Sequence, residues 1–287
     1  MKFIRVNKEG NIKNGIVFEE KLYFLEDIYK KEIELTEFIE IFDLNEILNQ
    51  IKKIEAYSLS DYTILSPIEE PRRNVICLGK NYLDHVNECA TGGIDKDLGR
   101  PKEPIFFTKM INRFINPYEN IDLNEETTKS LDYEGELAVI IGKEGKNIKE
   151  EDVKDYIFGY TILNDSSARD LQQKHSQWFK GKSLDNTCSL GPTILLKEET
   201  SYPPKLDIKT YVNNELRQSS NTENFIFSID YAISQLSQGT TLKVGDIIAT
   251  GTPKGVGMGF APPKFLKKGD ILKIDVEKIG TLINKIN

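Results

Sequence analysis

The chain has 287 residues, of which 39% are hydrophobic and 29% charged, so it can bury the core of one or two domains. Its 38 Lys and Arg against 45 Asp and Glu give a formal net charge of −7, so no basic field is available to hold a nucleic-acid backbone. The longest stretch without a charged residue covers only residues 231–242, whereas a membrane-spanning helix needs roughly 20 apolar residues. With no signal-peptide pattern and no paired cysteine framework, we expect a cytoplasmic protein without nucleic-acid or membrane partners.

Residues 1–66 are predicted to form a small α/β domain. Residues 3–6 and 16–25 have strand-like composition and are separated by turn signals. From Thr36 to residue 51, apolar residues recur at close to 3.6-residue spacing, which predicts one amphipathic helix with Thr36 as its N-cap. Pro67 and Pro71 then disfavour helix, so we place a domain boundary between residues 66 and 67.

Residues 67–287 alternate short β-rich segments with Gly and Pro. Strands are predicted at residues 74–78, 105–108, 133–141, 157–163, 193–196, 208–213, 246–250 and 271–276. Helical patterns are few, at residues 152–156, 170–177 and 230–237. Because strands and helices do not alternate regularly, a doubly wound parallel sheet is disfavoured, and we predict an α+β fold that is mainly β.

The first candidate for chemistry is a histidine beside a glutamate. His85 and Glu88 are three residues apart, so they lie together on one turn of a short helix. A carboxylate can orient an imidazole so that it takes a proton from water. An ordinary surface pair is the alternative. The charged segment from Thr91 to residue 104 has the composition of a mobile loop, so a lid carrying this base is possible.

A second candidate is the pair Glu134 and Glu136 on a predicted strand. Alternation places both on one strand face, and both faces are otherwise apolar. Two neighbouring carboxylates repel each other and resist burial, and a divalent cation removes both costs. With only two histidines and three cysteines in the chain, oxygen ligands and a cation such as Mg²⁺, Mn²⁺ or Ca²⁺ are favoured over zinc. A solvated face with two exposed glutamates is the alternative.

Asp165 follows the strand predicted at residues 157–163, within a polar and charged cluster. Functional side chains often lie at such strand ends, and Asp165 would supply a third carboxylate. The alternative is structural, with Asp165 or Ser166 capping the helix that follows.

Two glycine-containing segments resemble phosphate-binding motifs without matching them. Residues 181–183 read Gly-Lys-Ser, but Ser176 stands where a P-loop requires its first glycine. Residues 250–259 lack the third glycine of a dinucleotide-binding motif. The second segment is then either a turn whose amides hold a carboxylate or a loop that needs unusual dihedral angles.

The order of these motifs resembles the fumarylacetoacetate hydrolase superfamily over about residues 71–285. The matching segments are residues 77–82 with His85 and Glu88, then 107–109, 132–138, 159–160, 164–165, 168–170, 177–178, 181–185, 191–192, 212–213, 245–246, 251–257 and 268–270. The resemblance implies a mixed β-sandwich or roll in residues 67–287, preceded by the small N-terminal domain. It also implies a homodimer with one Mg²⁺ or Mn²⁺ per subunit.

Site residues follow from the resemblance by motif position. Glu134, Glu136 and Asp165 match the metal ligands, and His85 with Glu88 matches the water-activating pair. Lys182 matches the lysine that stabilises developing negative charge. The substrate contacts that the resemblance implies are Lys109, Arg169, Gln172 and Thr252.

The implied substrate is a small 2-oxo or dicarboxylic acid. The main expectation is Mg²⁺-dependent hydrolysis of a C–C bond in a 2,4-dioxo acid of the acylpyruvate type, with release of a pyruvate-like enolate. The same enolate-stabilising site would serve decarboxylation of an oxaloacetate-like acid or isomerisation of a 2-hydroxy-2,4-dienoate. A catalytically silent protein that binds a metal and a carboxylate is the third hypothesis.

Overall fold

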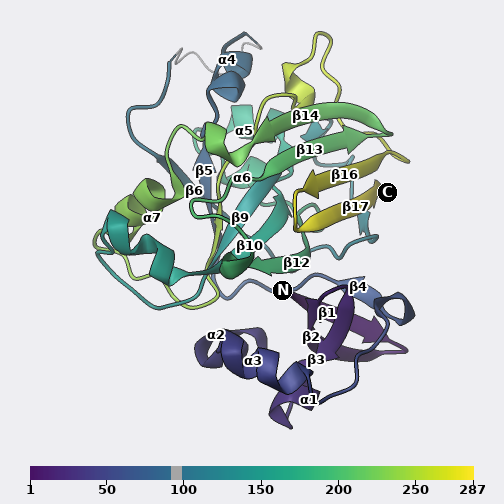
Figure 1. Cartoon of the computed structure of the whole chain (residues 1–287). Coiled ribbons are helices and arrows are strands. Elements are labelled where there is room, and N and C mark those ends of the chain that lie inside the picture. Colours follow the sequence, from purple (N-terminus) through teal and green to yellow (C-terminus); the bar gives the residue numbers. More distant parts are fainter. Residues whose placement is uncertain (92–98) are drawn as a thin grey trace.

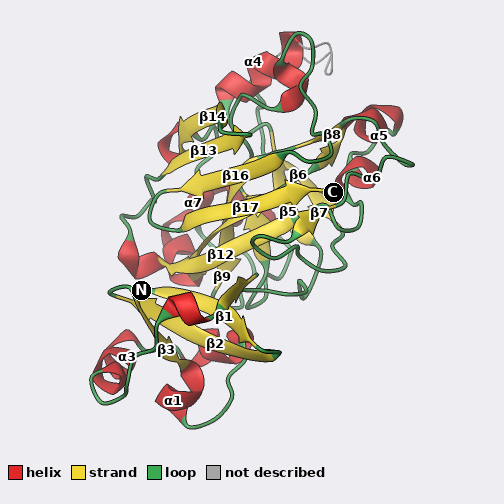
Figure 2. Ribbon diagram, turned by 90° about the vertical axis from the view of Figure 1, so that its right-hand side faces the viewer, coloured by secondary structure: helices red, strands yellow, loops and turns green. Residues whose placement is uncertain are grey.

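The computed structural model describes residues 1–91 and 99–287, and the fold is α+β and mainly β (Figure 1). Ten strands form a large mixed sheet in the order β3-β2-β1-β12-β10-β9-β15-β5-β6, and β4 pairs with β1 beside this path. A second sheet has the order β14-β13-β16-β17-β7, and β8 pairs with β11. Figure 2 shows the strands of the second sheet beside β12 and β9 of the large sheet, with the helices at the periphery.

The elements have the following bounds. The large sheet contains β1 (Lys2–Lys8), β2 (Asn11–Phe18), β3 (Lys21–Phe24), β4 (Thr63–Leu65), β5 (Val75–Gly79), β6 (Ile105–Lys109), β9 (Gly135–Ile141), β10 (Ile157–Asn164), β12 (Ser189–Leu196) and β15 (Ile247–Ala249). The other strands are β7 (Asn120–Ile121), β8 (Leu131–Asp132), β11 (Ser167–Ala168), β13 (Asp207–Val212), β14 (Glu215–Asn221), β16 (Ile271–Val276) and β17 (Gly280–Ile286). The α-helices are α1 (Leu25–Tyr29), α2 (Leu35–Ile41), α3 (Leu44–Ile51), α4 (Leu83–Thr91), α5 (Arg169–Lys174), α6 (Phe179–Lys182) and α7 (Ile229–Ser237). Within the described ranges, no helix is long and apolar enough to cross a membrane.

The helix predicted from Thr36 to residue 51 is in fact two helices, so this prediction is wrong. Helix α2 ends at Ile41, and Asp43 caps α3 by accepting hydrogen bonds from the amides of Asn45 and Glu46 at 2.8 and 3.0 Å. Asp43 has extended backbone angles, which interrupt the helical path. The segment predicted as a helix at residues 152–156 is a 3₁₀ helix, Glu150–Tyr156.

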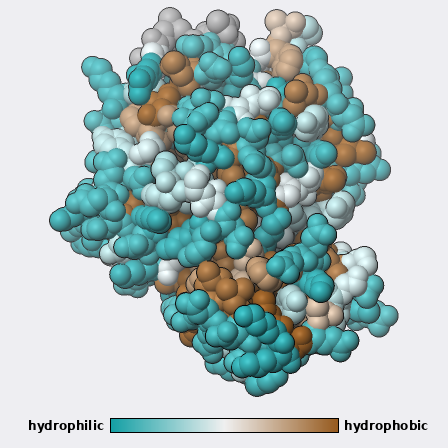
Figure 3. Space-filling view, in the orientation of Figure 1, coloured by the Kyte–Doolittle hydropathy of each residue, from teal (hydrophilic) through white to brown (hydrophobic). Residues whose placement is uncertain are grey.

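The N-terminal unit continues the large sheet. Lys2 and Phe3 of β1 pair with Leu195 and Ile194 of β12. On the helical side, the Phe38 ring lies 5.9 Å from that of Phe158, edge to face. Figure 1 shows this unit below the rest of the molecule, and Figure 3 shows apolar side chains gathered along the junction. Sheet and core thus cross the boundary that we placed at residues 66 and 67, which stays a prediction.

Strand β9 is buried on both faces. On one face, Leu137 and Val139 belong to the apolar cluster that includes residues of β13, β16 and β17. On the other face, Ala138 and Ile140 join the cluster that contains Phe38 of the N-terminal unit. Because the strand runs through the middle of the large sheet, the carboxylates at its beginning lie in the interior of the protein.

Candidate active site

Three buried carboxylates meet at one end of the large sheet. Glu136 of β9 pairs with Leu163 of β10, and Asp165 directly follows β10. The Asp165 amide donates to the Glu134 carbonyl at 2.9 Å, which keeps the two strand ends together. One oxygen from each of Glu134, Glu136 and Asp165 lies within 4.8 Å of the others, and all three residues are buried. Both structural alternatives, an exposed strand face and a helix cap, are therefore wrong: Ala168 is the N-cap residue of α5.

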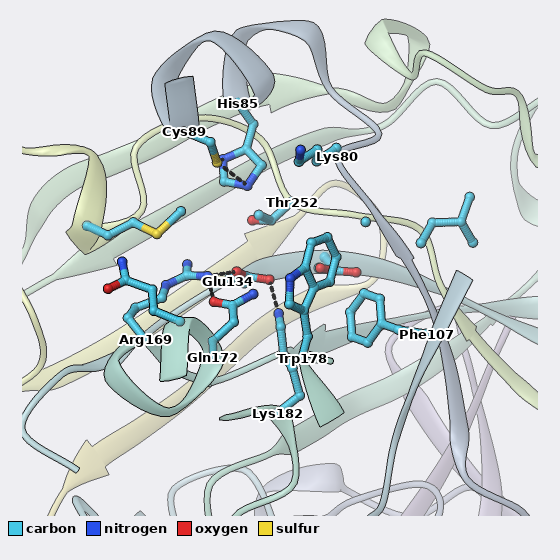
Figure 4. A pocket seen from close by; sticks show the side chains of 15 residues that line it. Lys80, His85, Cys89, Phe107, Glu134, Arg169, Gln172, Trp178, Lys182 and Thr252 are labelled. Atoms are coloured by element: carbon cyan, nitrogen blue, oxygen red, sulfur yellow. Dashed lines mark hydrogen bonds and ion pairs between the residues drawn. The ribbon is translucent and has the colours of Figure 1, made fainter. Parts of the chain in front are cut away.

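Cationic side chains surround this triad (Figure 4). The Lys182 ammonium lies 2.7 Å from Glu134 Oε2 and 2.7 Å from Asp165 Oδ2. Arg169 Nη1 lies 2.7 Å from Glu134 Oε1, and Lys109 Nζ lies 3.0 Å from Asp165 Oδ1. The pairing satisfies two of the three carboxylates, Glu134 and Asp165.

Glu136 carries the unbalanced charge of the cluster. Glu134, Asp165 and the neighbouring Asp132 each form an ion pair with Lys182, Arg169 or Lys109. Glu136 Oε2 accepts a hydrogen bond from the Gly251 amide at 2.8 Å, and the structure gives it no ion pair with a described residue. Burial, together with repulsion from Asp165 and Glu134, raises the pKa of Glu136 well above its usual range.

This charge pattern fits a divalent cation. Burial alone would raise the pKa of Glu134, but Lys182 and Arg169 hold it well below its usual range. The carboxylate that lacks such compensation is Glu136, and a cation bound by the triad would supply it. Three carboxylates are ligands of the hard type that Mg²⁺ and Mn²⁺ accept.

The histidine and glutamate of the predicted pair lie together on α4. His85 Nδ1 is 3.2 Å from Glu88 Oε2, and the Cys89 thiol is 3.6 Å from His85 Nε2. Burial alone would lower the pKa of His85, but hydrogen bonds with Cys89 and Glu88 and the charge of Glu134 raise it to about 10. These contacts favour the protonated imidazole.

The glycine-rich loop after β15 holds three carboxylates of the protein itself. The amide of Gly251 donates to Glu136, and that of Gly255 donates to both oxygens of Glu88 at 2.9 and 3.1 Å. The amides of Gly257 and Met258 donate to Asp132 at 2.7 and 3.1 Å. Gly255 has a φ of 103°, and an added Cβ would lie 1.9 Å from the Arg217 carbonyl oxygen, so only glycine fits there.

Asp132 is a positioning residue for which the sequence supplied no role. Its Oδ2 accepts a hydrogen bond from Arg169 Nε at 2.9 Å, while the loop amides hold the same carboxylate from the other side. Arg169 Nη1 also donates to Gln172 Oε1 at 3.0 Å. Arg169 Nη2 is buried and has no hydrogen-bond partner among the described residues, as expected of a group that binds an anionic ligand.

Replacing Asp132 with Asn should weaken both its ion pair with Arg169 and its hydrogen bonds with the amides of the glycine-rich loop. Removal of one partner from a buried ion pair typically costs about 3–5 kcal/mol, and we expect a loss of that order in the free energy of unfolding. Urea denaturation measures it, with exposed Asp155→Asn as the control. A loss no larger than that of the control would show that Asp132 does not hold this region.

Five of the predicted catalytic and substrate-binding residues line the pocket: His85, Arg169, Gln172, Lys182 and Thr252. Thr252 Oγ1 donates to the Gly135 carbonyl at 3.0 Å and accepts from Gln218 Nε2 at 2.7 Å, so it also braces β9.

Lys109 differs from the other predicted substrate contacts. It does not line the pocket, and its ammonium is fully buried, donating to the Ser166 carbonyl oxygen at 2.7 Å. Glu88 does not line the pocket either, and its carboxylate contacts His85 and the Gly255 amide. The predicted lid segment includes residues 92–98, which lie outside the described residues.

The pocket at the triad is small, with Phe107 and Trp178 together on one side and Arg169 on the other, charged side, next to Glu134 (Figure 4). Its volume is about 70 Å³. The charged and polar lining residues include Glu134, Glu136, Arg169, Gln172, Lys182, His85 and Thr252. The apolar and sulfur-containing lining residues include Leu78, Phe107, Trp178, Met258 and Cys89. These features define a candidate metal-assisted site for a small anionic substrate.

Comparison with known proteins identifies the family. Residues 74–287 match the model of the fumarylacetoacetate (FAA) hydrolase C-terminal domain. The chain is 51% identical over 230 residues to the oxaloacetate tautomerase YisK of Bacillus subtilis, which is 80% of this chain and 75% of that protein. It is 44% identical over 228 residues to the mitochondrial oxaloacetate tautomerase Fahd2a of Rattus norvegicus, 79% of this chain and 70% of that protein. The chain belongs to the fumarylacetoacetate hydrolase family, as its motifs indicated.

Two solved structures extend the likeness over the whole chain. A fumarylacetoacetate hydrolase from Exiguobacterium antarcticum has a TM-score of 0.84 at 38% identity, covering 100% of this chain and 99% of that one. The maleylpyruvate hydrolase of Sphingobium sp. SYK-6 has a TM-score of 0.78 at 25% identity, covering 100% and 98%, and was solved in complex with manganese (II) ion and pyruvate. The predicted family and fold class are confirmed. The individual site roles stay predictions.

Proposed function

We propose that the protein is a divalent-metal-dependent tautomerase of oxaloacetate or a similar short 2-oxo acid. The observation that carries this proposal is the position of His85, which lines a pocket of about 70 Å³ together with Glu134 and Glu136 of the carboxylate triad. Relatives that are 51% and 44% identical to this chain are oxaloacetate tautomerases, which supports the same reaction here. We further propose Mg²⁺ or Mn²⁺ as the cation and a homodimer as the assembly.

The cation would be held by Glu134, Glu136 and Asp165, where it would act as a Lewis acid toward the oxygens of the 2-oxo acid. Arg169 offers its unpartnered Nη2 to a substrate carboxylate. The pKa of Lys182 is raised well above its usual range by Asp165 and Glu134, although burial alone would lower it. Lys182 therefore remains an ammonium group and stabilises the negative charge of an enolate.

His85 is the proposed proton donor to C3 of the substrate. In the direction from enol to keto, the enol releases its hydroxyl proton to solvent and is bound as the enolate. His85 then donates its proton to C3, which completes the keto form, and takes up another proton from solvent. One proton leaves and one is gained, so the reaction is an isomerisation in which no C–C bond breaks.

The hydrolase expected first from the sequence is less well supported. The relatives that are 51% and 44% identical to this chain are oxaloacetate tautomerases and not C–C hydrolases. The specific observation that still favours hydrolysis is the 3.2 Å pair of His85 with Glu88, an arrangement suited to a general base. Incubation with acetylpyruvate tests it, since hydrolysis releases acetate and pyruvate.

The pH dependence of ketonisation should follow the protonated form of His85. We expect the enzyme-catalysed rate to change little from pH 7 to about 9, and to fall about tenfold per pH unit above the pKa of about 10. Disappearance of the enol absorbance measures this rate, after subtraction of the rate without enzyme, while circular dichroism confirms that the protein remains folded. A rate that rises through this range would instead indicate a neutral imidazole acting as base.

A further inference from the structure

We propose that Trp178 limits the length of the 2-oxo acid that the pocket accepts, and that it excludes dicarboxylic acids of six carbons or more. This inference rests on the proposed function and names its substrate class more closely. Trp178 directly precedes α6 and lines the pocket. Figure 4 shows its indole beside Phe107, close to the labelled groups of the charged side.

The indole is held in place from two sides. Its ring centroid lies 5.3 Å from that of Phe107, at an interplanar angle of 76°, an edge-to-face contact. On the other side it packs against the backbone of Gly79, where an added Cβ would lie 2.4 Å from Trp178 Cζ3. The indole therefore packs directly on Gly79, and the ring cannot move toward β5 without a steric clash.

The aromatic wall adjoins the charged side of the pocket directly. The Lys182 ammonium lies 5.2 Å from the centre of the Phe107 ring while it also contacts Glu134 and Asp165. An acid whose 2-oxo end lies at the carboxylate triad therefore meets Phe107 and Trp178 within a few bonds.

The volume of the pocket agrees with a short acid. One bound water needs about 10–15 Å³ of such space, so about 70 Å³ accommodates only about five to seven groups of that size. A four-carbon dicarboxylic 2-oxo acid, with about nine non-hydrogen atoms, already fills this space, so no room remains for two further methylenes. Pockets that exclude one methylene discriminate by about 10–200-fold.

Binding measurements with two acids of equal charge test the proposal. Calorimetric titration of the Mg²⁺-loaded protein with oxaloacetate and with 2-oxoadipate should give at least about tenfold weaker binding of the longer acid. Trp178→Ala should remove most of this difference by improving 2-oxoadipate binding. Phe179→Ala removes the next aromatic ring, which is 41% exposed and does not line the pocket, so it should leave the ratio unchanged.

The wild-type protein offers a second readout that does not require a variant to fold. Trp178 is the only tryptophan in the chain, so the intrinsic tryptophan fluorescence reports on this wall alone. Titration of the Mg²⁺-loaded protein with oxaloacetate, whose distal carboxylate extends toward this wall, should change the intensity or the emission maximum. No change at saturation, established by calorimetry, would overturn the proposal.

The length limit and the proposed reaction can be refuted independently of each other. A protein that tautomerises oxaloacetate while Trp178→Ala keeps the wild-type binding ratio would refute the length limit alone. A protein that shows the expected ratios without accelerating tautomerisation would refute the proposed reaction and support the length limit.

Discussion

Replacing Glu136 with Gln should lower the affinity for Mg²⁺ or Mn²⁺ by at least about 100-fold and make the metal-free protein more stable. The affinity falls because a ligand is lost, and changes even to the partners of metal ligands cost about 10–100-fold. The stability rises because Glu136 is the carboxylate of the triad without an ion pair to a described residue, so its ionised form destabilises the folded state.

The sign of this stability change depends on pH. Because the pKa of Glu136 in the folded protein lies above its ordinary value of 4.5, the wild type loses stability as the pH rises from that value, whereas the Gln variant does not. The advantage of the variant should therefore grow between pH 4.5 and neutral pH. Thermal unfolding with EDTA and with Mg²⁺ measures both effects, and the exposed Glu151→Gln is the control. A metal-free variant that melts below the wild type would mean that the Glu136 carboxylate supports the fold.

Replacing His85 with Gln should reduce the rate of enol–keto conversion by about 10²–10⁴-fold, the usual contribution of a general acid or base. Gln retains hydrogen-bonding capacity but cannot carry the proton. Binding of Mg²⁺ and of oxalate should be nearly unchanged, because His85 is on α4 whereas the carboxylates come from β9 and its vicinity. Stopped-flow decay of the enol absorbance gives the rate, and calorimetry gives the binding.

The chain provides a matched control for this substitution. His175 is its other histidine, and it is exposed and does not line the pocket. His175→Gln should therefore keep full activity. If His85→Gln keeps the wild-type rate as well, the proton must come from another group, and His85 has no part in the reaction.

The sequence predicted strands of apolar or alternating composition, such as β10 and β16, better than polar ones. Strand β10, IFGYTILN, has no charged residue and is rich in apolar and β-branched residues, so composition alone revealed it. Strand β14, with the sequence ELRQSSN, is largely polar and was missed, because its place in the sheet depends on pairing with β13 and not on its own composition. The break between α2 and α3 was missed because the helical spacing of apolar residues continues from α2 into α3, on both sides of Asp43.

The residues of the candidate site could be predicted from the sequence, but the hydrogen bonds that connect them could not. Motif order supplied the triad and the pair on α4. The glycine-rich loop was expected to hold a substrate carboxylate, yet its amides hold Glu136, Glu88 and Asp132 of the chain itself. These partners are more than 100 residues away in sequence, so only the fold could reveal the pairing. Trp178 belonged to a matching motif, but its contact with Gly79 depends on the packing of α6 against β5 and β6.

The most direct test of the account is the exchange of the C3 hydrogens of oxaloacetate in D₂O, followed by proton NMR with the Mg²⁺-loaded protein. We expect loss of the C3 signal to be much faster than with Mg²⁺ alone or with His85→Gln, and without additional pyruvate beyond the Mg²⁺ control, because tautomerisation moves protons and breaks no C–C bond. Exchange no faster than with the His85→Gln variant would contradict the account.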